Sequence, residues 1–224
     1  VEEPKFHFEP PKFKKKLDLP KASENPKSLG YLTARKLDPD KFYYAKNFRK
    51  FVNKLKPTFE SETYDEERII IPLYYKKNLI GFQGRALGPS KVKYITTMLS
   101  DDAPKLYGLD EIDEKEPIYI VEGPFDSTFV ENSVAMCGSD VDIRSFGWGN
   151  YIWIYDNEPR NREIVNRISK TIDRGDQVVI WPSDIDEKDI NDMVMTGKDV
   201  QSVIKSNTYS GLEAKLKFTT WKKI

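Results

Sequence analysis

The pattern of apolar and polar positions differs between the two halves of the chain. Residues 67–87, "ERIIIPLYYKKNLIGFQGRAL", predict two strands joined at "KKN", and "KVKYITT" at 91–97 predicts a further short strand. Residues 38–56 begin with an Asp-Pro helix start and continue with apolar residues at helical spacing, which predicts a helix. The first half is therefore a mixture of strands and helix.

After Asp110 strands alternate with helices. Strands are expected at 117–123, 134–138, 151–158 and 177–181, and helices at 125–132, 159–175, 189–197 and 199–207. Gly175 ends the longest of these helices. Such alternation predicts βα units around a largely parallel sheet, so the expected class is α/β, with a mixed N-terminal part before a mainly parallel sheet flanked by helices.

Charge divides the chain of 224 residues in a similar way. Residues 1–105 carry 22 Lys and Arg against 14 Asp and Glu, and residues 106–224 carry 14 against 22. A basic half joined to an acidic half suggests a polyanion held on one side and a metal on the other. Residues 1–28 hold five Pro and seven Lys and predict an extended tether. We expect a basic subdomain at 29–110, an acidic domain at 111–200 and a C-terminal extension at 201–224.

Residue counts exclude several kinds of chemistry. Cys137 is the only cysteine and His7 the only histidine, so a Cys/His zinc site cannot be built within this chain and Ser-His or Cys-His catalysis is unsupported. We expect Cys137 to be a small buried residue and His7 a surface residue. No apolar run approaches the roughly 20 residues that span a bilayer, and no secretory leader is visible. The remaining chemistry uses carboxylates, basic side chains and an oxygen-preferring metal.

Three acidic clusters follow three of the predicted strands. Glu122 comes after "IYIV", Asp156 and Glu158 come after "YIWIY", and Asp189 and Asp192 come soon after "QVVIW". The spacings of 34 and 33 residues correspond to about one βα unit each, so the three strand ends can converge on one site. Several carboxylates brought together need a shared cation, and oxygen ligands without His or Cys favour Mg²⁺ or Mn²⁺.

Each acidic residue also has an ordinary structural interpretation. Glu122 suits a salt-bridged strand end. Asp156 and Glu158 suit an N-cap and an acidic first turn for a helix from Pro159, and Asp189 and Asp192 suit helix capping as well. Asp126 is expected in a first helical turn, where capping is at least as good an explanation as metal support. Both kinds of role stay open at this stage.

The order of these motifs resembles a known domain. "YIVEGPFDS", then "YDNE", then "KDINDMV" is similar to the Toprim domain, which is shared by DnaG-type primases, topoisomerases and some nucleases. The resemblance covers about residues 117–197 and implies a metal site at Glu122, Asp156, Glu158, Asp189 and Asp192. Two positions depart from the family pattern: the D-x-D pair ends in Glu158, and Asn191 stands where the last pair often has Asp.

The first half narrows the resemblance. "YLTARKL", "RIIIPLYYKKNLIGFQGRALGPSKVKYITT" and "KLYGLDEI" resemble the basic subdomain that precedes Toprim in DnaG-type primases, most closely those of T-even-like tailed phages. In that family an Arg in a "GR" element and a Lys before the next strand face phosphates or template, and here these are Arg85 and Lys93. We predict nucleotide or template contacts also for Arg35, Lys50 and Arg68.

The resemblance implies a DNA primase core that joins ribonucleotides on single-stranded DNA with Mg²⁺ or Mn²⁺. The implied partners are single-stranded DNA, ribonucleoside triphosphates, an RNA–DNA hybrid and a replicative helicase, in the cytoplasm of the host if a phage encodes the chain. In that family a separate zinc module helps to select start sites, and zinc is not expected within this chain. Two other functions stay open: a Toprim nuclease with the same metal site, and a non-catalytic single-stranded nucleic-acid-binding subunit.

Overall fold

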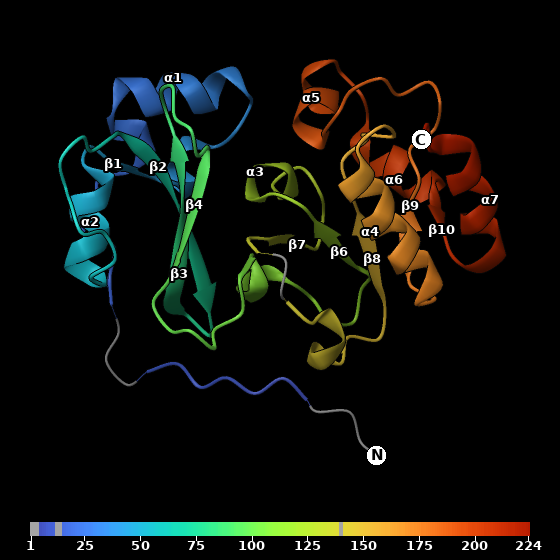
Figure 1. The fold of residues 1–224 in the computed structure, drawn as a ribbon, viewed down its shortest axis with the longest axis horizontal. Coiled ribbons are helices and arrows are strands. Elements are labelled where there is room, and N and C mark those ends of the chain that lie inside the picture. Colours follow the sequence, from blue (N-terminus) through green and yellow to red (C-terminus); the bar gives the residue numbers. More distant parts are fainter. Residues whose placement is uncertain (1–4, 12–14, 139–140) are drawn as a thin grey trace. The chain divides into compact units, whose positions relative to one another are not determined.

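The computed structural model describes residues 5–11, 15–138 and 141–224, and its chain forms two compact units. One unit comprises Val1–Asp110 with Cys137–Val141, and the other comprises Glu111–Met136 with Asp142–Ile224. Figure 1 shows the helices and strands of each unit along the chain. Within the described residues, no helix is both long enough and apolar enough to cross a membrane.

The first unit is built on a four-stranded antiparallel sheet. Its strand order is β1-β2-β3-β4, and the strand bounds are β1 Tyr43–Ala45, β2 Arg68–Tyr75, β3 Asn78–Ala86 and β4 Tyr94–Met98. The short strand β5 (Leu106–Tyr107) lies against β2. The predicted hairpin at "KKN" is confirmed: Lys76 and Lys77 both have positive φ, the twist that suits a two-residue hairpin turn.

Two helices of the first unit, α1 (Pro26–Ala34) and η2 (Pro39–Lys41), begin at side-chain caps, Asn25 and Asp38. The unit also contains η1 (Ala22–Glu24) and α2 (Phe48–Leu55), while η3 (Leu109–Glu111) lies at the change between the units. Asn25 accepts hydrogen bonds from the backbone amides of Lys27 and Ser28, and Pro26 occupies the first turn of α1. Phe48 and Phe51 of α2 pack with Phe82 of β3 in one hydrophobic cluster.

Two expectations about the first half are wrong. The single helix predicted for 38–56 is instead the short η2 and the later α2, because β1 pairs with β2 through Tyr43–Ala45 between them and extends the sheet there. The tether predicted for 1–28 is also shorter, since Phe8 is buried in a core cluster and regular structure begins at Ala22. The parts of that segment at 1–4 and 12–14 lie outside the described residues.

The second unit has the mainly parallel sheet that the sequence predicts. Its strand order is β10-β9-β8-β6-β7, with parallel pairs everywhere except at β10, which runs antiparallel to β9. The bounds are β6 Ile118–Val121, β7 Ser133–Met136, β8 Tyr151–Ile154, β9 Gln177–Val179 and β10 Thr208–Tyr209. Strand order and direction place the carboxyl ends of β6, β8 and β9 at the same edge.

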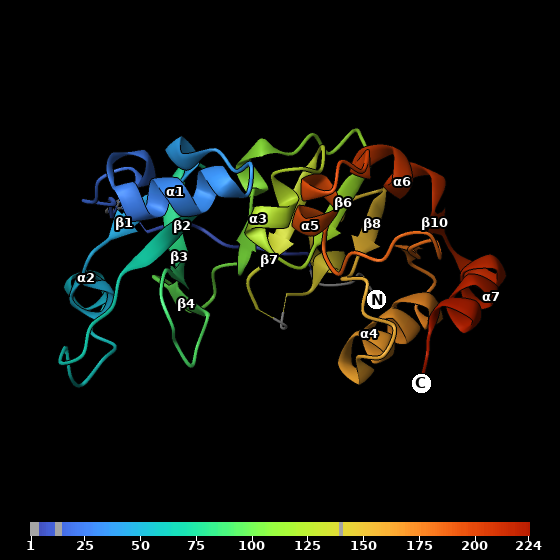
Figure 2. The same ribbon diagram turned by 90° about the horizontal axis from the view of Figure 1, so that it is seen from above.

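Hydrophobic cores lie on both faces of this sheet. Val179 and Trp181 pack with Ile190 and Met193 on one face, while Val178 and Ile180 pack with the opposite helices on the other. Alternate residues of β9 and the segment after it therefore serve opposite cores. Figure 2 shows α4 beside α7 and α3 beside α5, and the helix bounds are α3 Pro124–Ser127, η4 Ile143–Phe146, α4 Arg162–Asp173, α5 Ile190–Met195, α6 Val200–Ser206 and α7 Gly211–Trp221.

Several boundaries differ from the sequence-based ones. α4 begins at Arg162 rather than at Pro159, because Asn161 caps it by accepting from the amides of Glu163 and Ile164. Residues 201–224, expected as an extension, carry β10 and α7, which complete the sheet and one of its cores. Cys137 is buried, and burial raises the pKa of its thiol to about 12, while His7 is exposed beside Glu9. Both of these match the expectations.

Arg68 is a fully buried side chain that holds the β3–β4 connection. Its guanidinium donates to the carbonyl oxygens of Gly84 at 2.8 Å, Lys93 at 3.1 Å and Val92 at 2.7 Å, and it pairs with Glu66. A buried charge is tolerated when its donors are all used in this way. Gly84 makes room for the arrangement, since a Cβ there would come within 2.5 Å of the Phe48 ring.

We expect Arg68→Leu to lower the free energy of unfolding by about 2–4 kcal/mol, because several buried carbonyl oxygens lose their donor. Urea unfolding followed by circular dichroism measures the change. Lys50→Ala, at an exposed position of α2, is the control and should change stability by less than about 0.5 kcal/mol. Equal stability of Arg68→Leu and the unaltered chain would contradict this structural role.

Candidate metal centre and nucleic-acid contacts

The register of the parallel sheet brings the first two acidic clusters together. Val121 of β6 pairs with Ile154 of β8, so Glu122 and Asp156 follow at neighbouring positions of the same edge. The backbone amide of Asp156 donates to a carboxylate oxygen of Glu122 at 3.4 Å. The convergence that the 34-residue spacing predicts is therefore present in the structure.

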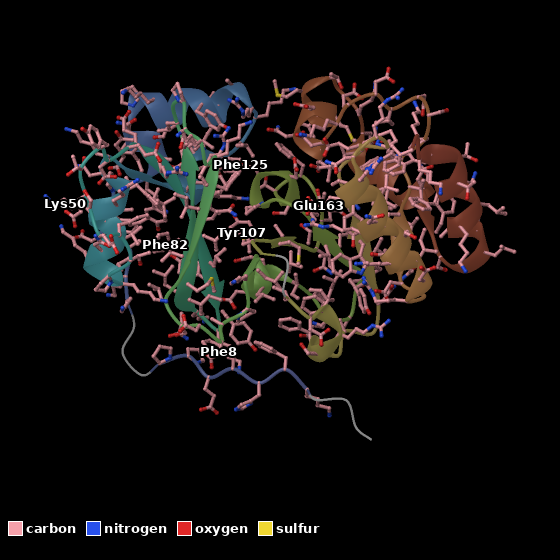
Figure 3. The ribbon with its side chains drawn as sticks, in the orientation of Figure 1. Phe8, Lys50, Phe82, Tyr107, Phe125 and Glu163 are labelled. Carbon is pink, nitrogen blue, oxygen red and sulfur yellow. The ribbon has the colours of Figure 1, made fainter. Side chains whose placement is uncertain are left out.

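Glu122 has a protein cation beside it. Arg167 of α4 places Nη1 3.4 Å from the Glu122 carboxylate, and its Nη2 lies 2.6 Å from Glu163 in the first turn of the same helix, labelled in Figure 3. The salt-bridged interpretation of Glu122 is thus realised. Burial nevertheless raises the pKa of Glu122, and Arg167 offsets that rise in part.

Asp126 and Asp189 meet at the N-terminus of α5. Asp189 caps α5 by accepting from the amide of Asp192 at 2.8 Å, as the capping interpretation states. Asp126 does not cap its own helix α3; it accepts from the amide of Asn191 at 2.8 Å, in the first turn of α5. Two carboxylates from distant segments therefore use the free N–H groups of one helix start.

Glu158 lies outside α4, in the loop between β8 and that helix. Since α4 begins at Arg162, the interpretation of Glu158 as an acidic first-turn residue is wrong, and Glu163 has that position. The carboxylate of Glu158 lies 3.6 Å from the ammonium group of Lys188, which is largely exposed. Asp192 is exposed in the first turn of α5.

These carboxylates influence one another strongly. Burial, followed by repulsion from Asp189, raises the pKa of Asp126 to about 7. Burial and the charge of Glu122 raise the pKa of Asp156 as well, with further contributions from Asp126, Asp189 and Glu158. A carboxyl group that holds its proton near neutral pH marks a concentration of negative charge that a cation would relieve.

The chemistry of the donor set fits a hard divalent cation. It consists of carboxylate oxygens from three strand ends and one helix, without sulfur or imidazole ligands, and such sets suit Mg²⁺ or Mn²⁺ rather than zinc. Within the described ranges, no three Asp, Glu, His or Cys side chains stand in a ready coordinating arrangement. The hydrogen bonds of Asp126 to Asn191 and of Glu122 to Arg167 occupy oxygen atoms that a metal would use.

Two predicted template-contacting arginines form one group in the first unit. The Arg35 guanidinium lies 3.7 Å from the centre of the Tyr31 ring, and that of Arg85 lies 5.3 Å from Tyr31 and 5.2 Å from Tyr94. Tyr94 is 42% exposed and follows Lys93, which is also exposed. Guanidinium groups next to accessible aromatic rings suit the phosphates and bases of a single strand.

The other two residues predicted to contact template, Lys50 and Arg68, differ in exposure. Lys50 is exposed on the outer side of α2, where Figure 3 labels it, and lines a hollow of about 350 Å³ with Lys16, Lys46 and Lys54. The expectation for Arg68 is wrong, because its side chain is completely buried and its donors are used within the unit. A side chain without exposed surface cannot contact template.

The sequence alone does not assign three residues of the candidate metal centre: Asp126, Arg167 and Lys188. Asp126 looked like a local cap, and only the packing of α3 against α5 brings it to the other carboxylates. Arg167 gave no signal beyond its position one turn after Glu163. Lys188 was part of the quoted "KDINDMV", and its neighbourhood with Glu158 depends on how the 182–189 segment folds.

The raised pKa of Asp126 predicts a pH-dependent stability of the chain in EDTA. Because this pKa is about 7 in the folded state and near 4 in the unfolded chain, the folded state binds the proton more tightly, and stability falls as pH rises from about 4 to about 7. Asp126→Asn keeps the acceptor for Asn191 without the charge. We expect it to raise Tm at pH 8 by about 5 °C or more.

Thermal unfolding between pH 5 and pH 8 in EDTA measures this difference. Asp184→Asn, at an exposed position of the same unit, is the control for the loss of one negative charge. A Tm gain of equal size in Asp184→Asn, or no gain in Asp126→Asn, would show that Asp126 is not under electrostatic strain.

Comparison with known proteins gives one curated relative and several similar structures. No family model matches the chain. The DNA primase of Enterobacteria phage T4 is 33% identical over 217 residues, which make up 92% of this chain and 63% of that protein. The chain thus spans less than two thirds of the length of this relative.

Solved structures share the fold. The E. coli primase catalytic core aligns with a TM-score of 0.61 at 18% identity, over 89% of this chain and 79% of that one. A DnaG primase catalytic domain bound to single-stranded DNA aligns with a TM-score of 0.57 at 19% identity, over 80% and 71%. These neighbours confirm the predicted fold class. By sequence the chain is a relative of the phage T4 DNA primase, and by fold it has the architecture of DnaG-type primase catalytic cores.

Proposed function

We propose that this chain is the catalytic core of a DNA primase and makes short RNA primers on single-stranded DNA. The observation that carries the proposal is the group of mutually repelling carboxylates at one sheet edge, in a chain 33% identical to a DNA primase. A purely structural set of caps would not require carboxyl groups with raised pKa values. Metal-dependent nucleotidyl transfer requires such a concentration of oxygen ligands.

We assign the acidic residues to two groups: direct metal ligands and carboxylates that lie near them. Glu122 and Asp156 would hold Mg²⁺ or Mn²⁺. Asp126 of α3 and Asp189 at the start of α5 would complete the set, with Glu158 and Asp192 nearby. A bound cation would supply charge neutralisation at the α-phosphoryl group and favour attack by the 3′-hydroxyl. Burial limits the contact of Glu122, Asp126 and Asp156 with water, which would strengthen their electrostatic attraction to a cation.

Two cations of the same unit suit the triphosphate. Lys188 is 59% exposed beside Glu158, and Arg167 is 42% exposed beside Glu122. Each faces a proposed metal ligand, so each would lie close to the phosphates of a bound ribonucleotide. Arg167 would make bidentate contacts through its planar group, and Lys188 would act as a point charge.

The first unit offers contacts for the template. Arg35, Arg85 and Lys93, with the rings of Tyr31 and Tyr94, form a surface suited to phosphates and stacked bases. The similar fold of a DnaG catalytic domain bound to single-stranded DNA supports this assignment. Further partners of the reaction would be ribonucleoside triphosphates, the RNA–DNA hybrid and a replicative helicase, acting in the cytoplasm of a host cell.

Incubation with single-stranded templates, labelled ribonucleotides and Mg²⁺ or Mn²⁺ tests the proposal. Short RNA products that depend on both template and metal are expected. Degradation of the template without RNA synthesis would indicate a nuclease instead of a primase. Binding of the DNA without either reaction would indicate a non-catalytic subunit.

Glu122→Gln should reduce primer synthesis by at least about 100-fold, because it removes a direct metal ligand while the side chain keeps its size. Product formation at saturating ribonucleotide measures the effect, and DNA binding should stay within about two-fold. Glu163→Gln is the matched control, since Glu163 is the other carboxylate bound by Arg167. Full activity of Glu122→Gln would refute the metal site.

Asp156→Ala should impair synthesis more than Glu158→Ala. Asp156 is at the centre of the repelling group, whereas Glu158 pairs with exposed Lys188 and has a longer side chain that can act through water. We expect the two losses to differ by about ten-fold or more. Comparison of both variants over a range of Mn²⁺ concentrations measures this, and equal, complete losses would show that Glu158 is a direct ligand.

A further inference from the structure

Asn157 lies between two of the proposed metal-binding residues and uses its whole side-chain amide. Its Nδ2 donates to the carbonyl oxygens of Ile185 at 2.9 Å and Glu187 at 3.0 Å. Its Oδ1 accepts from the indole Nε1 of Trp221 at 2.9 Å. An amide has two N–H donors and an acceptor oxygen, so this set satisfies both donors and the acceptor.

These bonds join two acidic loops. The backbone N–H of Asn157 donates to the carbonyl oxygen of Lys188 at 2.6 Å, one residue before Asp189. The loop that carries Asp156 is therefore tied at three points to the segment 185–188 that leads into α5. Tyr155, which precedes Asp156, is fixed as well, because its carbonyl oxygen accepts from the indole Nε1 of Trp181 at 2.8 Å.

The third partner comes from the end of the last helix. Trp221 is the final residue of α7, and its ring packs against the clusters on both faces of the sheet. Two residues later, the backbone N–H of Lys223 donates to the carbonyl oxygen of Pro159 at 2.9 Å. The end of α7 thus contacts the loop after β8 twice, at Asn157 and at Pro159.

We propose that Asn157 and Trp221 are positioning residues for the metal centre, a role that rests on the proposed function. Neither side chain supplies a charge to the cation. Carboxylates that repel one another would move apart if their loops were free. A hydrogen-bond network that holds the two loops keeps the ligands at the spacing a cation needs. α7 fixes this network because Trp221 is anchored in both cores.

The chemistry of the network explains why an amide stands between Asp156 and Glu158. An Asp at position 157 would set a carboxylate against the carbonyl oxygens of Ile185 and Glu187, since it has no donors when ionised. An Ala would leave these carbonyls and the Trp221 indole without their partner. Only a side chain with donors and an acceptor at this length fits all three.

Mn²⁺ titration of the whole chain, with free Mn²⁺ followed by electron paramagnetic resonance, tests the proposal. We expect Asn157→Ala to weaken Mn²⁺ binding by about ten-fold or more and Trp221→Phe by about three- to ten-fold. The double variant should bind as weakly as Asn157→Ala alone, because the Trp221 bond is already lost. Hydrogen exchange in EDTA should be faster at residues 156–158 and 186–189 in both single variants.

Trp153→Phe is the matched control. It removes an indole N–H that donates to a carboxylate oxygen of Asp176 at 3.2 Å, within the same unit and on β8 itself. Its Mn²⁺ affinity should stay within about two-fold of the unaltered chain, with exchange unchanged in both loops. This control separates positioning from a general loss of stability.

Unchanged Mn²⁺ affinity and unchanged loop exchange in Asn157→Ala and Trp221→Phe would overturn the positioning role. Equal losses in Trp153→Phe would overturn it too, because any lost indole bond would then have the same effect. An unaltered chain that binds no Mn²⁺ would instead refute the proposed function. Hydrogen exchange would then still decide whether Asn157 and Trp221 order the two loops.

Discussion

Repulsion between carboxylates at one edge of a parallel sheet is the constraint that shapes the second unit. Strand register brings the ends of β6 and β8 together, and the Asp156 amide donates to Glu122 there. Asp189 caps α5, and Asp126 of α3 accepts from the first turn of the same helix. The chain balances this charge in three ways: by the cations Arg167 and Lys188, by the free N–H groups of α5, and by raised pKa values. The proposed metal ion would neutralise the same negative charge.

Carboxylates that repel one another stay close only if the loops that carry them are held in place. The two cores on either face of the sheet anchor the segments after β8 and β9, and buried groups such as Trp181 and Tyr155 fix the backbone close to Asp156. Asn157 then links the loops directly. Stability is therefore supplied by the apolar faces, while the polar edge carries the unfavourable charges that the proposed function uses.

The first unit handles a buried charge in the opposite manner. Arg68 has no exposed surface, and its donors are satisfied by main-chain carbonyl oxygens and Glu66. The hydrogen-bond donors of Arg68 are thus used within its own unit, whereas Arg35 and Arg85 lie against tyrosine rings. What surrounds the guanidinium group thus separates the structural Arg68 from the two arginines that we propose contact the template, although all three occur in basic or strand-like sequence.

The sequence by itself determined the elements whose signals are local. Apolar runs bounded by turn residues gave the strands on either side of Glu122 and Asp156, the "KKN" hairpin needed only two residues with positive φ, and alternation of strands and helices gave the parallel sheet with acidic residues at its strand ends. These depend on neighbours a few residues apart.

Only the tertiary structure decided which of the candidate residues belong together. Residues 43–45 followed a helical pattern but pair with β2, because sheet hydrogen bonds outweigh a weak local preference. Burial removes Arg68 from the candidate binding residues, and helix packing brings Asp126 and Arg167 into the group of candidates. Exposure, ion pairs and pKa values arise from groups far apart in the chain, so no local pattern encodes them.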